Sequence, residues 1–278
     1  MKLFDSTINF TDKITVGGDK LALISGPCAV ESFDICLEIG KTVQEICKQL
    51  GISYIFKASF DKANRTSAGS FRSVGMDKSL AILERVKNEL NVPLITDVHE
   101  STQINEVAAV VDVLQIPAFL CRQTDLLLAA GDSGRAINVK RGQFMAPEDM
   151  RYAIEKIRST GNNNACLTER GVSFGYHNLV VDMRALPIMR QYSPVVFDVT
   201  HSVQQPGGAG GTSGGQREFA PFLARAAAAA GVDGFFIETH PEPAKALSDG
   251  PNMVPLDEMK QFMTMLKETW ELGNRYSK

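Results

Sequence analysis

Residues 54–67 read YIFKASFDKANRTS and join a short apolar run to a cluster of cations. The run 54–56 is typical of a buried β-strand, and Lys57 stands at its end. The side chains in and after this strand end that can bind an anion are Lys57, Ser59, Lys62, Asn64, Arg65, Thr66 and Ser67. Because charged, oriented hydrogen bonds are the strong ones, this segment favours phosphate or carboxylate binding over a merely solvated basic loop.

The pattern of a short apolar run followed by a loop and a helical segment occurs eight times along the chain. The predicted strands cover 21–25, 54–57, 93–98, 111–116, 136–140, 165–169, 195–199 and 234–238. Continuous apolar runs, rather than alternation, indicate strands of a parallel sheet that is buried on both faces. Eight such units in 278 residues predict an α/β fold, a single (β/α)8 TIM barrel over residues 1–278, with an open doubly wound sheet as the alternative.

Three local features refine this prediction. Residues 1–20 predict an N-terminal β-hairpin that ends in Gly17-Gly18. Asp77 is a candidate cap for the helix that carries the stripe from Leu80 to Leu90. The segment 206–215, PGGAGGTSGG, follows the seventh strand, where the barrel fold often carries a mobile lid.

Composition excludes several classes of protein. A formal net charge of −3 does not suit general nucleic-acid binding, which needs a basic face. No apolar run approaches the roughly 20 residues of a membrane span, and residues 1–10 lack the apolar core of a signal peptide. The five cysteines have no CxxC spacing and do not indicate a disulfide framework. We therefore expect a cytoplasmic protein whose ligands are small anions.

Polar side chains stand at or just beyond the predicted strand ends, where active sites of the barrel fold lie. They are Cys28, Lys57, Asp97, His99, Gln115, Lys140, Arg141, Glu169, Arg170, Asp198, His201, Glu238 and His240. Structural ion pairing could explain one or two of these groups, because buried charges must be matched. So many around one rim indicate a ligand site.

Two chemical subsets separate out of this ring. The cations Lys57, Lys62, Arg65, Lys140 and Arg170 are too many for one phosphate, which suggests two anionic groups. The second subset is Cys28, His201, Glu238 and Asp249. These four side chains offer sulfur, nitrogen and oxygen ligands that suit a divalent ion such as Zn²⁺, Fe²⁺ or Mn²⁺. A buried thiol and a hydrogen-bonded histidine without metal remain the simpler alternative.

Eight motifs, in order along nearly the whole barrel, resemble those of the 3-deoxy-D-manno-octulosonate 8-phosphate synthases. They are GPCAVES (26–32), KASFDKANRTS (57–67), TDVHE (96–100), QIPAFLCRQTD (115–125), NVKRGQFMAP (138–147), FGYHNLVVDMR (174–184), FDVTHSVQQPGG (197–208) and ETHPEPAKALSDGP (238–251). The resemblance implies a cytoplasmic, homotetrameric (β/α)8 transferase. It would condense phosphoenolpyruvate with arabinose 5-phosphate and release inorganic phosphate, for lipopolysaccharide biosynthesis.

The resemblance also assigns roles by position. Phosphoenolpyruvate would be held near its carboxylate by Lys57, Ser59, Lys62 and Gln115, and at its phosphate by Lys140 and Arg170. The pentose phosphate would be bound by Asn64, Arg65, Thr66 and Asp97, with Arg122 reaching into a neighbouring subunit's site. The residues expected to act in catalysis are Cys28, Lys62, His201 and Asp249. The implied metal ligands are Cys28, His201, Glu238 and Asp249.

Two positions deserve comparison with the family pattern. A metal-independent branch has asparagine in place of Cys28, so this chain resembles the metal-dependent branch. Thr66 stands where the family more often has serine, which preserves the hydroxyl.

Three other readings stay open. The related 3-deoxy-D-arabino-heptulosonate 7-phosphate synthases use erythrose 4-phosphate, but their loop reads KPRTS where this chain has KANRTS at 62–67. Lys57 could instead be the Schiff-base lysine of an aldolase. A non-catalytic sugar-phosphate sensor is the third alternative.

Overall fold

The computed structural model describes residues 7–64, 67, 69, 71–207 and 214–276. Within them, eight parallel strands form the central sheet: β3 (Ala22–Gly26), β4 (Ser53–Lys57), β5 (Leu94–Asp97), β6 (Val113–Ile116), β7 (Ala136–Lys140), β8 (Ala165–Glu169), β11 (Val195–Asp198) and β14 (Gly234–His240). Strand β14 pairs with both β3 and β11, so the sheet closes on itself. The predicted (β/α)8 barrel is confirmed and the open sheet is excluded. Each strand begins and ends within two residues of its predicted bounds.

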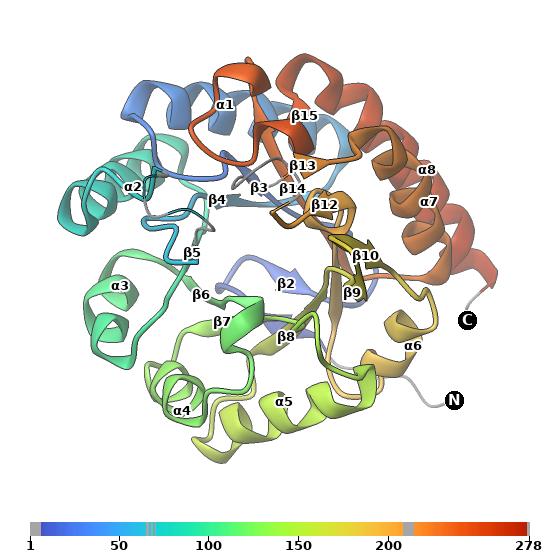
Figure 1. The fold of residues 1–278 in the computed structure, drawn as a ribbon, viewed down its shortest axis with the longest axis horizontal. Helices are drawn as coiled ribbons and strands as arrows, with labels where there is room; N and C mark the ends of the chain where they lie inside the picture. Colours follow the sequence, from blue (N-terminus) through green and yellow to red (C-terminus); the bar gives the residue numbers. More distant parts are fainter. Residues whose placement is uncertain (1–6, 65–66, 68, 70, 208–213, 277–278) are drawn as a thin grey trace.

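Helices surround the strands as a ring (Figure 1). In the described chain they are α1 (Phe33–Leu50), α2 (Met76–Leu90), α3 (Ile104–Val110), α4 (Thr124–Asp132), α5 (Met150–Ser159), α6 (Ala185–Met189), α7 (Ala220–Ala230) and α8 (Met259–Tyr276). Helix α1 begins after Ser32, whose hydroxyl accepts a hydrogen bond from the Ile35 amide, and ends at Gly51 in the left-handed region. Among the described residues, the structure has no helix with both the length and the apolar character needed to cross a bilayer.

The prediction that Asp77 caps α2 is wrong. The helix begins one residue earlier, at Met76, and Gly75 is its N-cap with φ of 99°. The chain before the helix is fixed by Ser73, whose hydroxyl donates to the Phe60 carbonyl, so a tertiary contact sets the start. Asp77 lies in the first turn, where its charge interacts favourably with the helix dipole.

The N-terminal hairpin closes one end of the barrel. Strands β1 (Ile8–Asn9) and β2 (Thr15–Val16) pair in antiparallel fashion, which confirms the hairpin for the described part of residues 1–20. Ile8, Phe10 and Val16 pack into the same apolar cluster as the barrel interior, and the Asn9 amide donates to Asn164 Oδ1 at 3.0 Å. In Figure 1, β2 lies in the middle of the ring of helices.

Short strands also lie in the loops that follow β8, β11 and β14, at the C-terminal end of the barrel. They are β9 (Val172–Gly175) with β10 (Asn178–Val180), β12 (Gln204–Gln205) with β13 (Gly214–Gly215), and β15 (Val254–Pro255) beside β14. The predicted lid at 206–215 falls mostly on 208–213, outside the described residues. All five cysteines are free, in agreement with the absence of a predicted disulfide framework.

Side chains alternate between the two faces of a strand, so residues two positions apart point to the same face. On each barrel strand, one such pair points into the barrel interior. The first of each pair forms the lower set: Ile24, Ile55, Ile95, Val113, Ala136, Cys166, Val196 and Phe236, which belong to one apolar cluster with the hairpin. The second, two residues further along, forms the upper set: Gly26, Lys57, Asp97, Gln115, Asn138, Thr168, Asp198 and Glu238. The interior therefore changes from apolar to polar toward the strands' C-terminal ends.

Candidate active site

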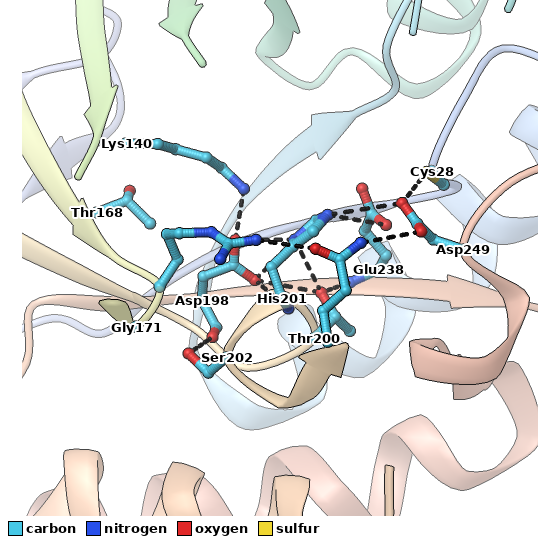
Figure 2. Close-up of polar contacts among 12 residues, drawn as sticks. Cys28, Lys140, Thr168, Gly171, Asp198, Thr200, His201, Ser202, Glu238 and Asp249 are labelled. Carbon is cyan, nitrogen blue, oxygen red and sulfur yellow. Dashed lines mark hydrogen bonds and ion pairs between the residues drawn. The ribbon is translucent and has the colours of Figure 1, made fainter. Parts of the chain in front are cut away.

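Three of the four predicted metal ligands lie together at the C-terminal end of the barrel. Cys28 follows β3, Glu238 belongs to β14, and Asp249 precedes a short 3-10 turn at Gly250–Asn252. Their ligand atoms all lie within 4.8 Å of one another, and Cys28 Sγ is 3.4 Å from Asp249 Oδ2. Figure 2 shows these side chains pointing toward one another. Residues more than 200 positions apart thus meet at one point.

His201, the fourth predicted ligand, faces this group through Nε2. That atom lies 3.7 Å from Glu238 Oε2 and 3.9 Å from Asp249 Oδ2. The other ring nitrogen, Nδ1, lies 3.0 and 2.9 Å from the two carboxylate oxygens of Asp198 (Figure 2). A carboxylate can only accept, so Asp198 fixes the proton on Nδ1 and leaves the lone pair of Nε2 toward the group. The sequence placed Asp198 in the polar ring but gave it no role.

The donor set fits a divalent transition ion. Glu238 Oε2 is buried and has no hydrogen-bond partner among the described residues, so an acceptor is left for a cation at this point. Burial and the Glu238 charge raise the pKa of the Cys28 thiol, a shift that a coordinated cation reverses. Thiolate, imidazole and two carboxylates are ligands of Zn²⁺, Fe²⁺ and Mn²⁺ sites.

A constrained turn holds Asp249 in place. Its φ of 52° lies in the left-handed region, which a residue with a side chain rarely adopts. The following Gly250 has no room for a side chain, because a Cβ there would lie 2.1 Å from the Pro243 carbonyl oxygen. Backbone strain of this kind persists where the surrounding structure fixes it, and such positions cluster at functional sites.

Two lysines lie beside Glu238. Lys57 Nζ is 2.5 Å from Glu238 Oε1 and donates to the Cys28 carbonyl at 2.9 Å, whereas Lys62 Nζ is 4.0 Å from Oε1 and donates to Ser59 Oγ at 3.0 Å. Burial alone would raise the pKa of Glu238, but its basic neighbours, Lys57 foremost, together outweigh burial and lower the pKa below its ordinary value. Lys57 is buried and paired with Glu238, which disfavours it as a Schiff-base lysine.

Lys62 remains a cation in this setting. Burial would lower its pKa, but the nearby Cys28, Glu238 and Asp97 outweigh burial and raise the pKa above its ordinary value. Its ammonium group therefore suits an anionic ligand at the barrel opening.

A run of hydrogen bonds leads from Ser59, two residues after β4, through the upper-set residues of β5, β6, β7 and β8. Asp97 accepts from Ser59 Oγ and from Gln115 Nε2. Gln115 Oε1 accepts from Asn138 Nδ2 at 2.9 Å, and Asn138 Oδ1 accepts from Thr168 at 2.6 Å. These bonds satisfy buried polar groups and fix the orientation of each amide.

Sequence reasoning gave no role to Asn138 or Thr168. The alternation of side chains along a strand could have identified them. Asn138 precedes Lys140 by two residues and Thr168 precedes Arg170 by two residues, and residues two positions apart on a strand share a face.

The cations on the other side of the opening differ in how they are paired. Lys140 Nζ is 2.5 Å from Asp198 Oδ2 and 3.6 Å from the centroid of the Phe236 ring, and burial lowers its pKa. Arg141 is paired with Glu169 at 2.5 Å. Arg170 is buried, but its Nη2 donates only to the neutral Gln204 at 3.0 Å, and Nη1 has no hydrogen-bond partner within the described ranges. Among the described residues, Arg170 thus keeps donor capacity for an anion.

The structure does not bring every predicted site residue into this group. Arg65 and Thr66 lie outside the described residues. Asn64 is exposed in a turn after β4. Arg122 is exposed between β6 and α4, where its carbonyl accepts from Lys156 at 3.1 Å.

Comparison with known proteins identifies the family of this chain. The model of the family described as the DAHP synthetase I family matches residues 5–275. The chain belongs to the DAHP synthetase I family.

Within the DAHP synthetase I family, the chain is similar to proteins named 2-dehydro-3-deoxyphosphooctonate aldolase. The relative from Desulfotalea psychrophila is 56% identical over 259 residues, covering 93% of this chain and 92% of the relative. The relative from a Cyanothece species is 58% identical over 261 residues, covering 93% and 96%. The relative from Geobacter sp. strain M21 is 58% identical over 272 residues, covering 95% and 100%. The resemblance predicted from the eight motifs is confirmed.

Proposed function

We propose that this protein is a transferase that condenses phosphoenolpyruvate with D-arabinose 5-phosphate and water. The products are 3-deoxy-D-manno-octulosonate 8-phosphate and inorganic phosphate. The observation that supports the proposal is that Lys57, Lys62, Lys140 and Arg170 lie at the same barrel opening as the four proposed metal ligands. The relatives are named for the same eight-carbon 3-deoxy-2-oxo acid phosphate. This reaction supplies lipopolysaccharide biosynthesis, and we assign it to the cytoplasm.

The anionic groups of phosphoenolpyruvate match two groups of donors. The Nη1 of Arg170 has no hydrogen-bond partner in the described part of the chain, and Arg170 with Lys140 would hold the phosphate through charge-assisted hydrogen bonds. The carboxylate would lie near Lys57, Ser59, Lys62 and Gln115. The raised pKa of Lys62 keeps it cationic, as this role needs.

The pentose phosphate would bind at the adjacent loop. Its proposed ligands are Asn64, Arg65 and Thr66, with Asp97 on the sugar hydroxyls. The exposed Arg122 would complete the site of a neighbouring subunit in a homotetramer.

The reaction forms one carbon–carbon bond and breaks one carbon–oxygen bond. Carbon 3 of phosphoenolpyruvate attacks the aldehyde carbon of the open-chain pentose, and the aldehyde oxygen takes up a proton. Water adds at carbon 2 and loses a proton. The carbon 2–oxygen bond to phosphate then breaks and the carbon 2 hydroxyl loses its proton to the departing phosphate, which leaves a ketone and inorganic phosphate. Holding both substrates together at the barrel opening, with cations where negative charge develops, would lower the barrier.

Cys28, His201, Glu238 and Asp249 are the proposed ligands of a divalent ion. When bound, such an ion supplies Lewis-acid chemistry that can orient the aldehyde or activate water. Asp198 holds the His201 ring with Nε2 toward the site, and Lys57 balances the charge of Glu238.

One assay tests this function against its rivals. Phosphate release from phosphoenolpyruvate is measured with arabinose 5-phosphate and with erythrose 4-phosphate, before and after chelation. We expect turnover with the pentose, loss of turnover on chelation, and recovery when Zn²⁺, Fe²⁺ or Mn²⁺ is added. Preference for erythrose 4-phosphate would identify a heptulosonate synthase, and no release with either sugar would favour a sensor. Full activity in the metal-stripped protein would remove the ion from the mechanism.

A further inference from the structure

The side chain of Gln204 contacts two residues of the candidate site, Arg170 and Asp249. Its Oε1 accepts a hydrogen bond from Arg170 Nη2 at 3.0 Å, and its Nε2 donates to Asp249 Oδ1 at 3.1 Å. It thus joins the arginine proposed to hold phosphate to a carboxylate proposed to hold the metal.

The orientation of this amide follows from its partners. A guanidinium group can only donate and an ionised carboxylate can only accept, so the Gln204 oxygen faces Arg170 and its nitrogen faces Asp249. Glutamate at this position could accept from Arg170 but could not donate to Asp249. Methionine, of similar length, cannot donate and is at most a weak acceptor.

The backbone of Gln204 is fixed independently of these contacts. Gln204 pairs with Gly215 in the β12–β13 ladder, and the Gln216 amide donates to the Val203 carbonyl at 3.0 Å. Gly215 leaves no room for a side chain, because a Cβ there would lie 1.5 Å from Asn252 Oδ1. The neighbouring Gln205 instead contacts the exposed Asn178 Oδ1, at 3.4 Å.

The two oxygens of Asp249 have separate partners. Oδ2 lies 3.4 Å from Cys28 Sγ and 3.9 Å from His201 Nε2, within the proposed ligand group. Oδ1 is the oxygen that Gln204 holds. The contact with Gln204 therefore sets which oxygen faces the other ligands, on a turn whose backbone is already constrained.

We propose that Gln204 is a positioning residue that orients Asp249 toward the metal and Arg170 toward the phosphate. This inference rests on the metal site of the proposed function. Hydrogen-bond partners behind metal ligands contribute about 10- to 100-fold to metal affinity in other sites, and we expect a loss of that size when this one is removed.

The experiment measures binding of Co²⁺ to the metal-stripped protein by competition with a chromophoric chelator. Gln204→Glu and Gln204→Met should each weaken Co²⁺ affinity by about 10- to 100-fold. With saturating metal, Gln204→Met should also raise the KM for phosphoenolpyruvate more than it lowers kcat, because Arg170 loses its acceptor. Gln205→Glu is the matched control: the same change on the same strand should leave Co²⁺ affinity unchanged. Thermal unfolding establishes that each variant is folded.

The outcomes separate this inference from the proposed function. Equal Co²⁺ affinity in the wild type and both Gln204 variants would overturn the inference and leave the reaction standing. A wild type that turns over substrates but binds no Co²⁺ would overturn the metal site and the inference together. Weakened Co²⁺ binding in the Gln204 variants of a protein that releases no phosphate would support the inference while the proposed reaction fails.

Discussion

The lower and upper sets of the barrel interior come from the same strands and differ completely in chemistry. Ile55 and Lys57 share one face of β4, and Phe236 and Glu238 share one face of β14, yet each pair changes from apolar to charged within two residues. Two residues along a strand span about 7 Å. The comparison shows that one closed barrel can bury its lower interior for stability and use its upper interior for binding.

The two sets contribute differently to folding. The lower set and the hairpin exclude water, and burial of their apolar surface favours the folded state. The upper set removes charges from water, as at the pair of Lys57 with Glu238. In such buried pairs the cost of desolvation offsets most of the attraction between the charges. We therefore attribute the upper set to function rather than to stability.

Two neighbouring arginines give the largest expected contrast. Arg141→Met leaves the buried Glu169 without its cation, so the free energy of unfolding should fall by about 3–5 kcal/mol. Arg170 forms no ion pair with any residue that the structure describes, so Arg170→Met should change the free energy of unfolding by about 1 kcal/mol or less. The same change should lower kcat/KM for phosphoenolpyruvate about 100-fold, since a charged hydrogen bond contributes about 1.5–3 kcal/mol. Urea unfolding and steady-state kinetics measure both effects.

One result would contradict the predicted difference between Arg141 and Arg170. A large loss of stability in Arg170→Met with unchanged kinetics would make Arg170 a structural residue. It would also remove the distinction between paired and free cations at the opening.

A truncation in the lower set should affect stability alone. Ile55 is fully buried, so Ile55→Ala should lower the free energy of unfolding by roughly 2–4 kcal/mol through lost burial and the cavity it leaves. The KM values for both substrates should stay at their wild-type level. Urea unfolding and steady-state kinetics of the folded variant test this, and KM values that rise as much as in an upper-set variant would contradict the division into two sets.

Low pH should lower the free energy of unfolding by protonating carboxylates of the upper set. Burial would raise the pKa of Asp97, but Lys57 and Lys62 outweigh it and hold the pKa below its ordinary value. Asp97 therefore stabilises the fold above its unfolded pKa of about 3.9, and this contribution is lost as the pH falls below that value. Between pH 4 and pH 3, Asp97→Asn should reduce the slope of unfolding free energy against pH by up to about 1.4 kcal/mol per unit.

The Asp97 prediction is measured by urea unfolding across this pH range. The control is Asp112→Asn, a change at a partly exposed carboxylate outside the barrel interior. An identical slope in wild type and Asp97→Asn would show that the pKa of the Asp97 carboxylate is not lowered in the folded protein.

Strand periodicity predicted the barrel, and strand-end chemistry predicted many of the residues that the structure brings together at the candidate site. Lys57, Asp97 and Glu238 stand where a rule about barrel strands places them, so position alone brought them together. Gln204 was not predicted, because its partners lie 34 and 45 positions away and a glutamine in a loop has no distinctive pattern. The start of α2 was predicted wrongly, since a contact between Ser73 and Phe60 decides it. The placement of Arg65 and Thr66 stays a prediction.

The hairpin packs beneath the lower set and covers the N-terminal end of the barrel, where the Asn9 amide donates to Asn164. With that end covered and the lower set packed, the proposed substrates would reach the upper set from the C-terminal end of the strands. If one substrate binds deeper than the other, it would have to bind first, so the hairpin would influence binding order without contacting either substrate.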